Sequence, residues 1–253
     1  MALSFSKHPS LVAYVTCGDP DMATTFDIVL AAIEAGADVI ELGVPFSDPV
    51  ADGPVIQRAS ERALKNGTTL DQVLTLARKI REKSDAGLII FSYLNPIMRM
   101  GSAKFCVAAE QAGVDGALIT DLPTEEAAEY LSEMRKRKLA TVFLAAPTST
   151  DVRLKLIAKA STGFVYAVSR TGVTGAQKQM TEDARKLVSR LRAHTKLPIA
   201  VGFGISTAAQ FRSVSAFADA AVVGSAIVET IERNPGKEAV SVAQFVRSLV
   251  DGL

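Results

Sequence analysis

The apolar run Ala37-Asp-Val-Ile-Glu-Leu-Gly43 leads directly into Val44-Pro-Phe-Ser-Asp-Pro-Val-Ala-Asp-Gly-Pro54, which is rich in proline and aspartate. The run is typical of a buried strand, and the segment after it is typical of a loop. The strand carries a glutamate, Glu41, near its end, and the loop carries Asp52. A buried carboxylate has a raised pKa, which suits it to acid–base catalysis near neutral pH.

The same carboxylates also have a purely structural interpretation. Glu41 could pair with a basic group, because an unpaired buried charge is costly. Asp48 or Asp52 could cap a helix that begins near Gly53. For one isolated carboxylate this interpretation is the more frequent one, so the choice depends on the rest of the chain.

Short apolar runs recur along the whole sequence, and most are rich in Val, Ile, Leu or Phe. They are apolar throughout rather than alternating, which is typical of strands covered on both faces. The predicted strands cover residues 11–17, 37–43, 87–93, 116–120, 140–145, 163–169, 198–204 and 220–225.

Amphipathic helical patterns separate these strands. Residues 24–34, for example, place apolar side chains at the spacing i, i+3, i+4, i+7, which buries one stripe of a helix. The other predicted helices cover residues 54–65, 69–83, 103–112, 124–137, 151–160, 182–193, 207–217 and 225–232, with a last helix after residue 236.

Eight strands that alternate with helices predict a (β/α)8 TIM barrel, an α/β fold, formed by residues 1–253 as a single domain. A doubly wound open sheet is the alternative. It is disfavoured because the turn after the first strand, Thr16-Cys-Gly-Asp-Pro20, lacks the glycine pattern of dinucleotide-binding folds.

Composition excludes several classes of function. The net charge is +1, and the only basic run is Arg135-Lys-Arg-Lys138, so we expect no nucleic-acid partner. No apolar stretch is long enough to span a membrane, and the N-terminus lacks a targeting pattern, so we expect a cytoplasmic protein. Two cysteines and two histidines form no metal-binding motif, so we expect neither a metal nor a cofactor.

Glycines follow the last three predicted strands, in residues 169–175, 201–206 and 223–227. Glycine lets the backbone approach an anion closely, and helix N-termini offer unpaired N–H groups. Barrels commonly bind phosphate after their seventh and eighth strands, often with a short extra helix, for which residues 225–232 are suited. These glycines could instead only permit tight turns, but their recurrence on successive strands favours a phosphate site.

The motif of residues 41–54 resembles the tryptophan synthase α subunit family. Four further motifs carry the resemblance in the right order, and it extends from about Tyr14 to the end. They are Tyr14-Val-Thr-Cys-Gly-Asp-Pro20, Ser169-Arg-Thr-Gly-Val-Thr-Gly175, Gly202-Phe-Gly-Ile-Ser206 and Gly224-Ser-Ala-Ile-Val228.

The resemblance implies a (β/α)8 barrel and a carbon–carbon lyase. The family cleaves indole-3-glycerol phosphate to indole and glyceraldehyde 3-phosphate, and its indole passes to a pyridoxal-phosphate-dependent β subunit. We therefore expect a β-subunit partner, in a heterotetramer. By the same resemblance, Glu41 is the general acid–base group and Asp52 is the partner of the indole nitrogen. Tyr166 matches a tyrosine near the glutamate, although core packing explains it equally well.

The remaining site residues are also implied by the resemblance. Residues expected to line the indole pocket are Tyr14, Tyr93 and Leu118. Thr174 belongs to a loop expected to close over the substrate near Asp52. Residues expected to bind phosphate are Gly175, Gly204, Gly224 and Ser225, and those expected to face the β partner, on loops, are Asp48, Pro49 and Asn95.

One departure from the family concerns the lead before the first strand. It has only about ten residues, where the family has room for a helix that covers the N-terminal face of the barrel. Because function lies at the opposite face, this loss bears on stability rather than on chemistry.

Three other functions remain open. The chain could be a stand-alone lyase that releases free indole, or a weakly catalytic subunit that mainly activates a β partner. It could also be another phosphate-binding barrel, such as a sugar-phosphate isomerase or epimerase. The loop that carries Asp52 argues against the last of these.

Overall fold

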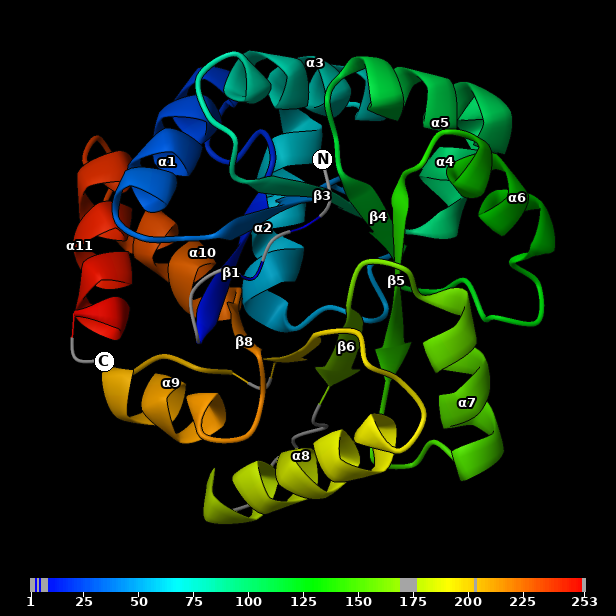
Figure 1. The fold of residues 1–253 in the computed structure, drawn as a ribbon. Coiled ribbons are helices and arrows are strands. Elements are labelled where there is room, and N and C mark those ends of the chain that lie inside the picture. Colours follow the sequence, from blue (N-terminus) through cyan, green and yellow to red (C-terminus); the bar gives the residue numbers. More distant parts are fainter. Residues whose placement is uncertain (1–2, 4, 6–8, 169–176, 203, 252–253) are drawn as a thin grey trace.

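The computed structural model describes residues 3, 5, 9–168, 177–202 and 204–251, and it has a closed barrel of eight parallel strands (Figure 1). Each strand pairs with the next in the sequence, and the eighth pairs with the first. This arrangement confirms the predicted fold. The strands are β1 (Ser10–Thr16), β2 (Val39–Gly43), β3 (Gly87–Ser92), β4 (Gly116–Ile119), β5 (Ala140–Ala145), β6 (Val165–Val168), β7 (Ile199–Gly202) and β8 (Ala220–Val223).

Helices surround the ring of strands, and α1 and α11 lie side by side at its edge (Figure 1). The assignment of residues 1–253 to one domain stays a prediction. The helices are α1 (Met22–Glu34), α2 (Pro54–Lys65), α3 (Leu70–Arg81), α4 (Leu94–Met100), α5 (Ser102–Gln111), α6 (Ala128–Lys136), α7 (Asp151–Ala160), α8 (Gln177–Arg192), α9 (Ala208–Ser215), α10 (Ser225–Arg233) and α11 (Glu238–Val250).

Helix α4 is not among the helices predicted from the sequence. Its third residue is Pro96, which suggests a break but is tolerated in the first turn of a helix, where its missing N–H costs nothing. Asn95 therefore lies in the first turn of α4 and not on a loop. The other differences are shifts at helix ends, the largest at α8, which begins at Gln177 rather than at residue 182.

Alternate residues of each strand face two different cores. On β1, Leu11, Ala13 and Val15 pack in the large cluster between the barrel and the helices. Val12 belongs instead to a cluster inside the barrel, with Ile89 and other inward-facing side chains. Both faces of every strand are covered, which explains why the strands are continuously apolar in the sequence.

The short N-terminal lead closes the bottom of the barrel with two side chains. Leu3 and Phe5 pack against the interior cluster, and the Phe5 and Phe164 rings meet edge to face with centroids 5.5 Å apart. A Cβ on Gly163 would lie 2.8 Å from Leu3 Cδ1, so this glycine makes room for the leucine. The lead thus supplies apolar cover at the N-terminal face of the barrel.

Three aspartates at the N-terminal end tie neighbouring strands together. Asp38, Asp115 and Asp219 stand directly before β2, β4 and β8. Their carboxylates accept hydrogen bonds from the backbone N–H groups of Leu11 (2.9 Å), Leu88 (2.8 Å) and Ile199 (2.7 Å), respectively. Asp115 and Asp219 also pair with arginines, Arg81 (2.7 Å) and Arg192. Carboxylates at this end therefore serve the architecture.

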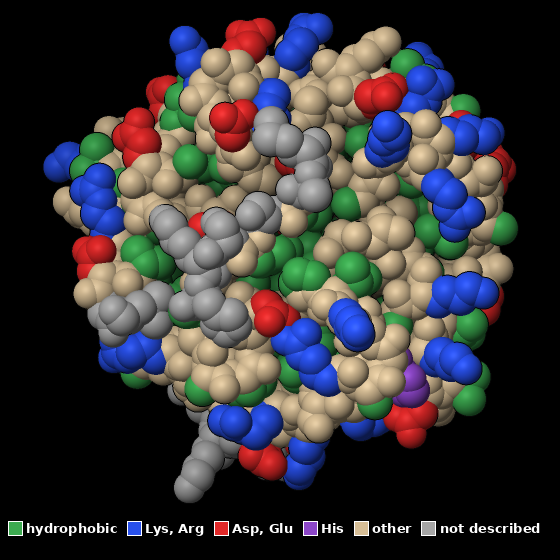
Figure 2. Space-filling view, viewed as in Figure 1, with side chains coloured by type: hydrophobic (Ala, Val, Ile, Leu, Met, Phe, Trp, Pro, Cys, Tyr) green, Lys and Arg blue, Asp and Glu red, His purple; other side chains and the backbone are tan. Residues whose placement is uncertain are grey.

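The surface carries charges of both signs. On the face that Figure 2 shows, basic and acidic side chains are interspersed around the rim, which agrees with a net charge of +1. Within the described part of the chain, no helix is both long enough and apolar enough to cross a membrane.

Candidate active site

A cavity of about 560 Å³ opens at the C-terminal ends of the strands, around the strand-two loop (residues 44–53) and the N-terminus of α10. Its described lining contains two carboxylates and no basic side chain. The lining residues are Tyr14, Glu41, Val50, Ala51, Asp52, Gly53, Ile56, Phe91, Thr120, Leu144, Tyr166, Val168, Gly202, Gly204, Val222, Gly224 and Ser225.

Glu41 is fully buried on β2, with 0% of its surface exposed. Neither of its carboxylate oxygens has a hydrogen-bond partner among the described residues. Burial therefore disfavours the charged form and raises the pKa of Glu41 to about 8. The described residues provide no basic partner for Glu41, so the group is a carboxylic acid that can donate a proton at neutral pH.

Asp52 is half-buried and belongs to the strand-two loop. Tyr93 Oη donates a hydrogen bond to Asp52 Oδ2 over 3.0 Å. Burial raises the pKa of Asp52 to about 6, and the hydrogen bond from Tyr93 opposes that rise. Asp52 is therefore mostly ionised at pH 7, whereas Glu41 is mostly protonated.

Neither loop aspartate caps helix α2. The N-cap residue of α2 is Gly53, and no side chain accepts a hydrogen bond at that cap. Asp48 accepts instead from the Ser47 hydroxyl over 2.6 Å. The capping interpretation of Asp48 and Asp52 is therefore wrong, and Asp52 is left to face the cavity.

Two tyrosines lie inside the barrel near Glu41, each beside a glycine. A Cβ on Gly43 would lie 2.4 Å from Tyr14 Oη, and a Cβ on Gly202 would lie 2.6 Å from Tyr166 Oη. Both glycines are therefore needed to accommodate the phenol groups. Burial, with the nearby carboxylates, raises the pKa of both tyrosines well above the usual value, so both stay neutral.

Glycines and a helix terminus form the other end of the cavity. Helix α10 begins at Ser225, and its N-cap residue, Gly224, provides no side-chain cap, so the first N–H groups of the helix remain available. Gly204 has a φ of +73°, a conformation that favours glycine. Thr174 and Gly175 lie outside the described residues.

Two residues expected to line the indole pocket are not among the described lining residues. Leu118 is fully buried in the interior cluster, and Thr120, two residues later, lines the cavity in its place. Tyr93 is not among the lining residues but holds Asp52 from behind. Apolar lining comes instead from Phe91, Leu144, Val222 and Ile56, which sequence analysis missed. Only the strand register reveals which inward residue reaches the cavity.

The rim beside the cavity carries the residues expected to face a partner. Asp48 and Pro49 lie in the strand-two loop, and Asn95 lies in α4. Two large apolar side chains are exposed on the same two segments: Val50, at 87%, and Met98, at 64%.

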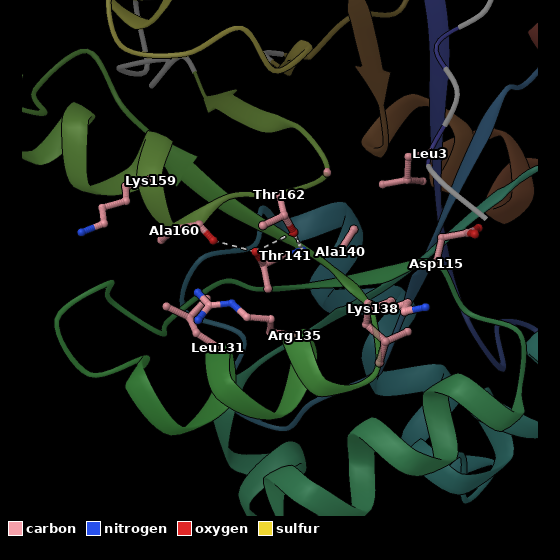
Figure 3. Close-up of a pocket in the computed structure, with 12 residues that line it drawn as sticks. Leu3, Asp115, Leu131, Arg135, Lys138, Ala140, Thr141, Lys159, Ala160 and Thr162 are labelled. Atoms are coloured by element: carbon pink, nitrogen blue, oxygen red, sulfur yellow. Dashed lines mark hydrogen bonds between the residues drawn. The ribbon is translucent and has the colours of Figure 1, made fainter.

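A second cavity, of about 410 Å³, lies at the N-terminal end of the barrel (Figure 3). The Thr141 hydroxyl in its wall already bonds to Ala160 O over 2.6 Å, and the cationic groups of Arg135 and Lys138 point in different directions (Figure 3). The described residues form no cluster of three or more His, Cys, Asp or Glu side chains that could hold a metal ion. The candidate active site is therefore the cavity around Glu41 and Asp52.

Comparison with known proteins identifies the family of this chain. A family model described as "Tryptophan synthase alpha chain" matches residues 2–251. The chain is 52% identical to the tryptophan synthase alpha chain of Solibacter usitatus (strain Ellin6076), over 99% of this chain and 94% of that protein. The chain belongs to the tryptophan synthase alpha chain family. The resemblance found in the sequence is confirmed, and the chain is a member of a lyase family of tryptophan biosynthesis.

Solved structures support the same family. A mutant tryptophan synthase alpha-subunit from Pyrococcus furiosus superposes with a TM-score of 0.90 at 39% identity, over 97% of this chain and 99% of that one. A chain of the tryptophan synthase complex from the same organism superposes with a TM-score of 0.89 at 38% identity, over the same shares. Tryptophan synthase alpha chains thus share this barrel.

Proposed function

We propose that the chain cleaves indole-3-glycerol phosphate to indole and glyceraldehyde 3-phosphate by a retro-aldol reaction. The observation that carries the proposal is the pair of carboxyl groups in one cavity, with Glu41 protonated and Asp52 ionised at neutral pH. Their environments separate their pKa values, which is how one site holds both an acid and an anion. The family to which the chain belongs supports the same reaction.

The reaction uses each group in a definite way. Glu41 donates its proton to indole C3, and the bond between C3 and the side chain breaks as the adjacent hydroxyl loses its proton. That proton returns to Glu41, so the acid is regenerated and the protons balance. Positive charge develops on the indole ring meanwhile, and the carboxylate of Asp52 stabilises it through the ring N–H.

The phosphate group is assigned to the uncapped N-terminus of α10. Its free N–H groups and the positive end of the helix dipole favour an anion there. Gly224 has a φ of −117°, which any residue adopts, so Gly224→Ala tests the site without straining the backbone. We expect Gly224→Ala to raise KM several-fold with a smaller effect on kcat. A normal affinity for glycerol 3-phosphate would place the phosphate elsewhere.

Apolar side chains would hold the indole ring. Phe91, Leu144 and Val222 line the cavity beside Glu41, and Tyr14 and Phe91 meet edge to face with ring centroids 5.1 Å apart. Neutral tyrosines add a polar edge without adding charge. Tyr166 is proposed to help to place Glu41, whose charge contributes to the raised pKa of this tyrosine.

We also propose that the chain works in the cytoplasm with a tryptophan synthase β subunit, in a heterotetramer. The exposed Val50 and Met98 and the neighbouring Asp48, Pro49 and Asn95 would form the contact. The solved complex from Pyrococcus furiosus, to which the chain is similar, supports such a partner. Since Asp52 shares its loop with Pro49, a partner that orders this loop also orders the carboxylate.

The decisive experiment is indole release from indole-3-glycerol phosphate by the isolated chain, repeated with a β subunit. Coupling of this kind is typically about 5–150-fold, and Pro49→Ala should reduce it. High activity alone with no response to the partner would indicate a stand-alone lyase. Negligible activity in both conditions, with the β subunit still activated, would indicate a regulatory subunit. Turnover of a sugar phosphate without indole would contradict the proposal.

A further inference from the structure

Tyr93 makes two hydrogen bonds to consecutive residues of the strand-two loop. Its Oη donates to Asp52 Oδ2 and accepts from the backbone N–H of Ala51, each over 3.0 Å. The two loop residues are more than forty positions away in the sequence. One hydroxyl therefore connects the end of β3 to both the backbone and the carboxylate of the loop.

The tyrosine itself is held firmly. Only 2% of its surface is exposed, and its ring packs against Phe46 with centroids 5.1 Å apart. Tyr93 is also the N-cap residue of α4, and the next backbone N–H, that of Leu94, donates to Asp121 Oδ1 over 2.7 Å. The phenol hydroxyl consequently has a fixed position, from which it can orient the strand-two loop.

Among the described residues, few other contacts determine where the Asp52 side chain points. The Asp52 backbone is held by its N–H, which donates to Pro49 O (3.0 Å), and by its carbonyl, which accepts from Gln57 Nε2 (2.9 Å). Both of these contacts involve main-chain atoms of Asp52 and do not involve its carboxylate. Tyr93 thus has the contact that can aim the carboxylate.

We propose that Tyr93 is a positioning residue, whose hydroxyl holds the carboxylate of Asp52 toward the cavity. This role differs from the expected one, in which Tyr93 lines the indole pocket. The inference rests on the proposed function, because it takes Asp52 to be the group that stabilises the indole ring. It predicts that the hydroxyl of Tyr93 affects catalysis through Asp52.

The surroundings of Asp52 make the hydroxyl matter for protonation as well. The titratable groups that face Asp52 are Tyr93, Tyr14, Tyr166 and, in the same cavity, Glu41. None of these described groups is a cation, and among them Tyr93 favours the ionised carboxylate through its hydrogen bond. Without its hydroxyl, the pKa of Asp52 rises further, and a smaller fraction of the protein holds an ionised Asp52 at pH 6.

The test is the pH profile of indole release by Tyr93→Phe, which keeps the ring and its packing on Phe46. We expect kcat to fall roughly 10-fold at pH 6, since the free energy of a hydrogen bond to a charged group corresponds to a factor of at least about 10. The loss should be smaller at pH 8, and the acid limb of the profile should move to higher pH. Binding of glycerol 3-phosphate should not change.

Tyr130→Phe is the matched control. Tyr130 is also buried and its hydroxyl also donates one hydrogen bond, to Ala117 O, but it lies on α6, away from the lining residues. We expect its pH profile to match that of the parent. A loss for Tyr93→Phe that is equal at every pH, with an unmoved acid limb, would overturn the proposal.

The double variant separates this inference from the proposed function. In the Asp52→Asn background, Tyr93→Phe should have little further effect, because the group through which it acts is gone. If Asp52→Asn itself retains near-normal cleavage, the proposed function fails. If Asp52→Asn is inactive but Tyr93→Phe behaves like the parent at all pH values, only the role of Tyr93 is wrong.

Discussion

Carboxylates at the two ends of the barrel have opposite environments. At the N-terminal end, Asp115 accepts from a backbone N–H at 2.8 Å and pairs with Arg81 at 2.7 Å. At the C-terminal end, Glu41 is equally enclosed, and its oxygens have no partner among the described residues. The same chemical group therefore fastens strands at one end and keeps a transferable proton at the other. The two carboxyl groups differ in their hydrogen-bond and ionic partners, although both are buried.

Replacement of Glu41 should have the largest effect on turnover. We expect Glu41→Gln to lower kcat by about 10²–10⁴-fold, because a positioned acid–base group contributes about this much. Indole release under saturating substrate measures the loss, and circular dichroism checks that the fold is kept. Near-normal turnover would show that the unpartnered carboxyl group is not the acid.

At the N-terminal end of the barrel, replacement of Asp115 should lower the free energy of unfolding rather than kcat. Asp115→Ala removes the carboxylate that pairs with the half-buried Arg81 and leaves the buried N–H of Leu88 without its acceptor, and we expect this loss to cost about 3 kcal/mol. Urea unfolding measures the loss of free energy of unfolding. At a temperature where the variant is folded, its kcat should stay within about twofold of the parent. A selective loss of kcat would show that the two ends are not separate in function.

Asp52 is an intermediate case, because this carboxylate at the C-terminal end of the barrel accepts a hydrogen bond from Tyr93. Asp52→Asn should lower kcat by roughly 100-fold, since it removes the charge that stabilises the indole ring in the transition state. Binding of glycerol 3-phosphate, measured by calorimetry, should persist. An equally severe loss of that binding would argue that Asp52 only shapes the loop.

Glu41 should also affect how the stability of the protein depends on pH. The pKa of Glu41 is about 8 in the folded protein and near 4.5 ordinarily, so the folded state binds this proton more tightly. Its stabilising contribution is therefore complete below about pH 4.5 and is lost as the pH rises toward 8. In Glu41→Gln this decline of stability with rising pH should be absent. Parallel stability curves for parent and variant would show that Glu41 is not perturbed.

The barrel and the buried Glu41 could both be predicted from the amino-acid sequence alone. Continuous apolar runs alternating with amphipathic helices specify strands covered on both faces, because local periodicity reports which faces are buried. Glu41 was identifiable for a related reason: a carboxylate in such a run must be either paired or perturbed. The loop after β2 was recognisable from its prolines and aspartates, and with it Asp52.

Which of these residues come into contact could be learned only from the tertiary structure. Whether Leu118 or Thr120 reaches the cavity depends on the stagger between strands, which no local pattern contains. The bond from Tyr93 to Asp52 and the use of Asp115 by a neighbouring strand are contacts between distant parts of the chain. Closure of the barrel brings these parts together, and it leaves the carboxyl group of Glu41 without a partner among the described residues.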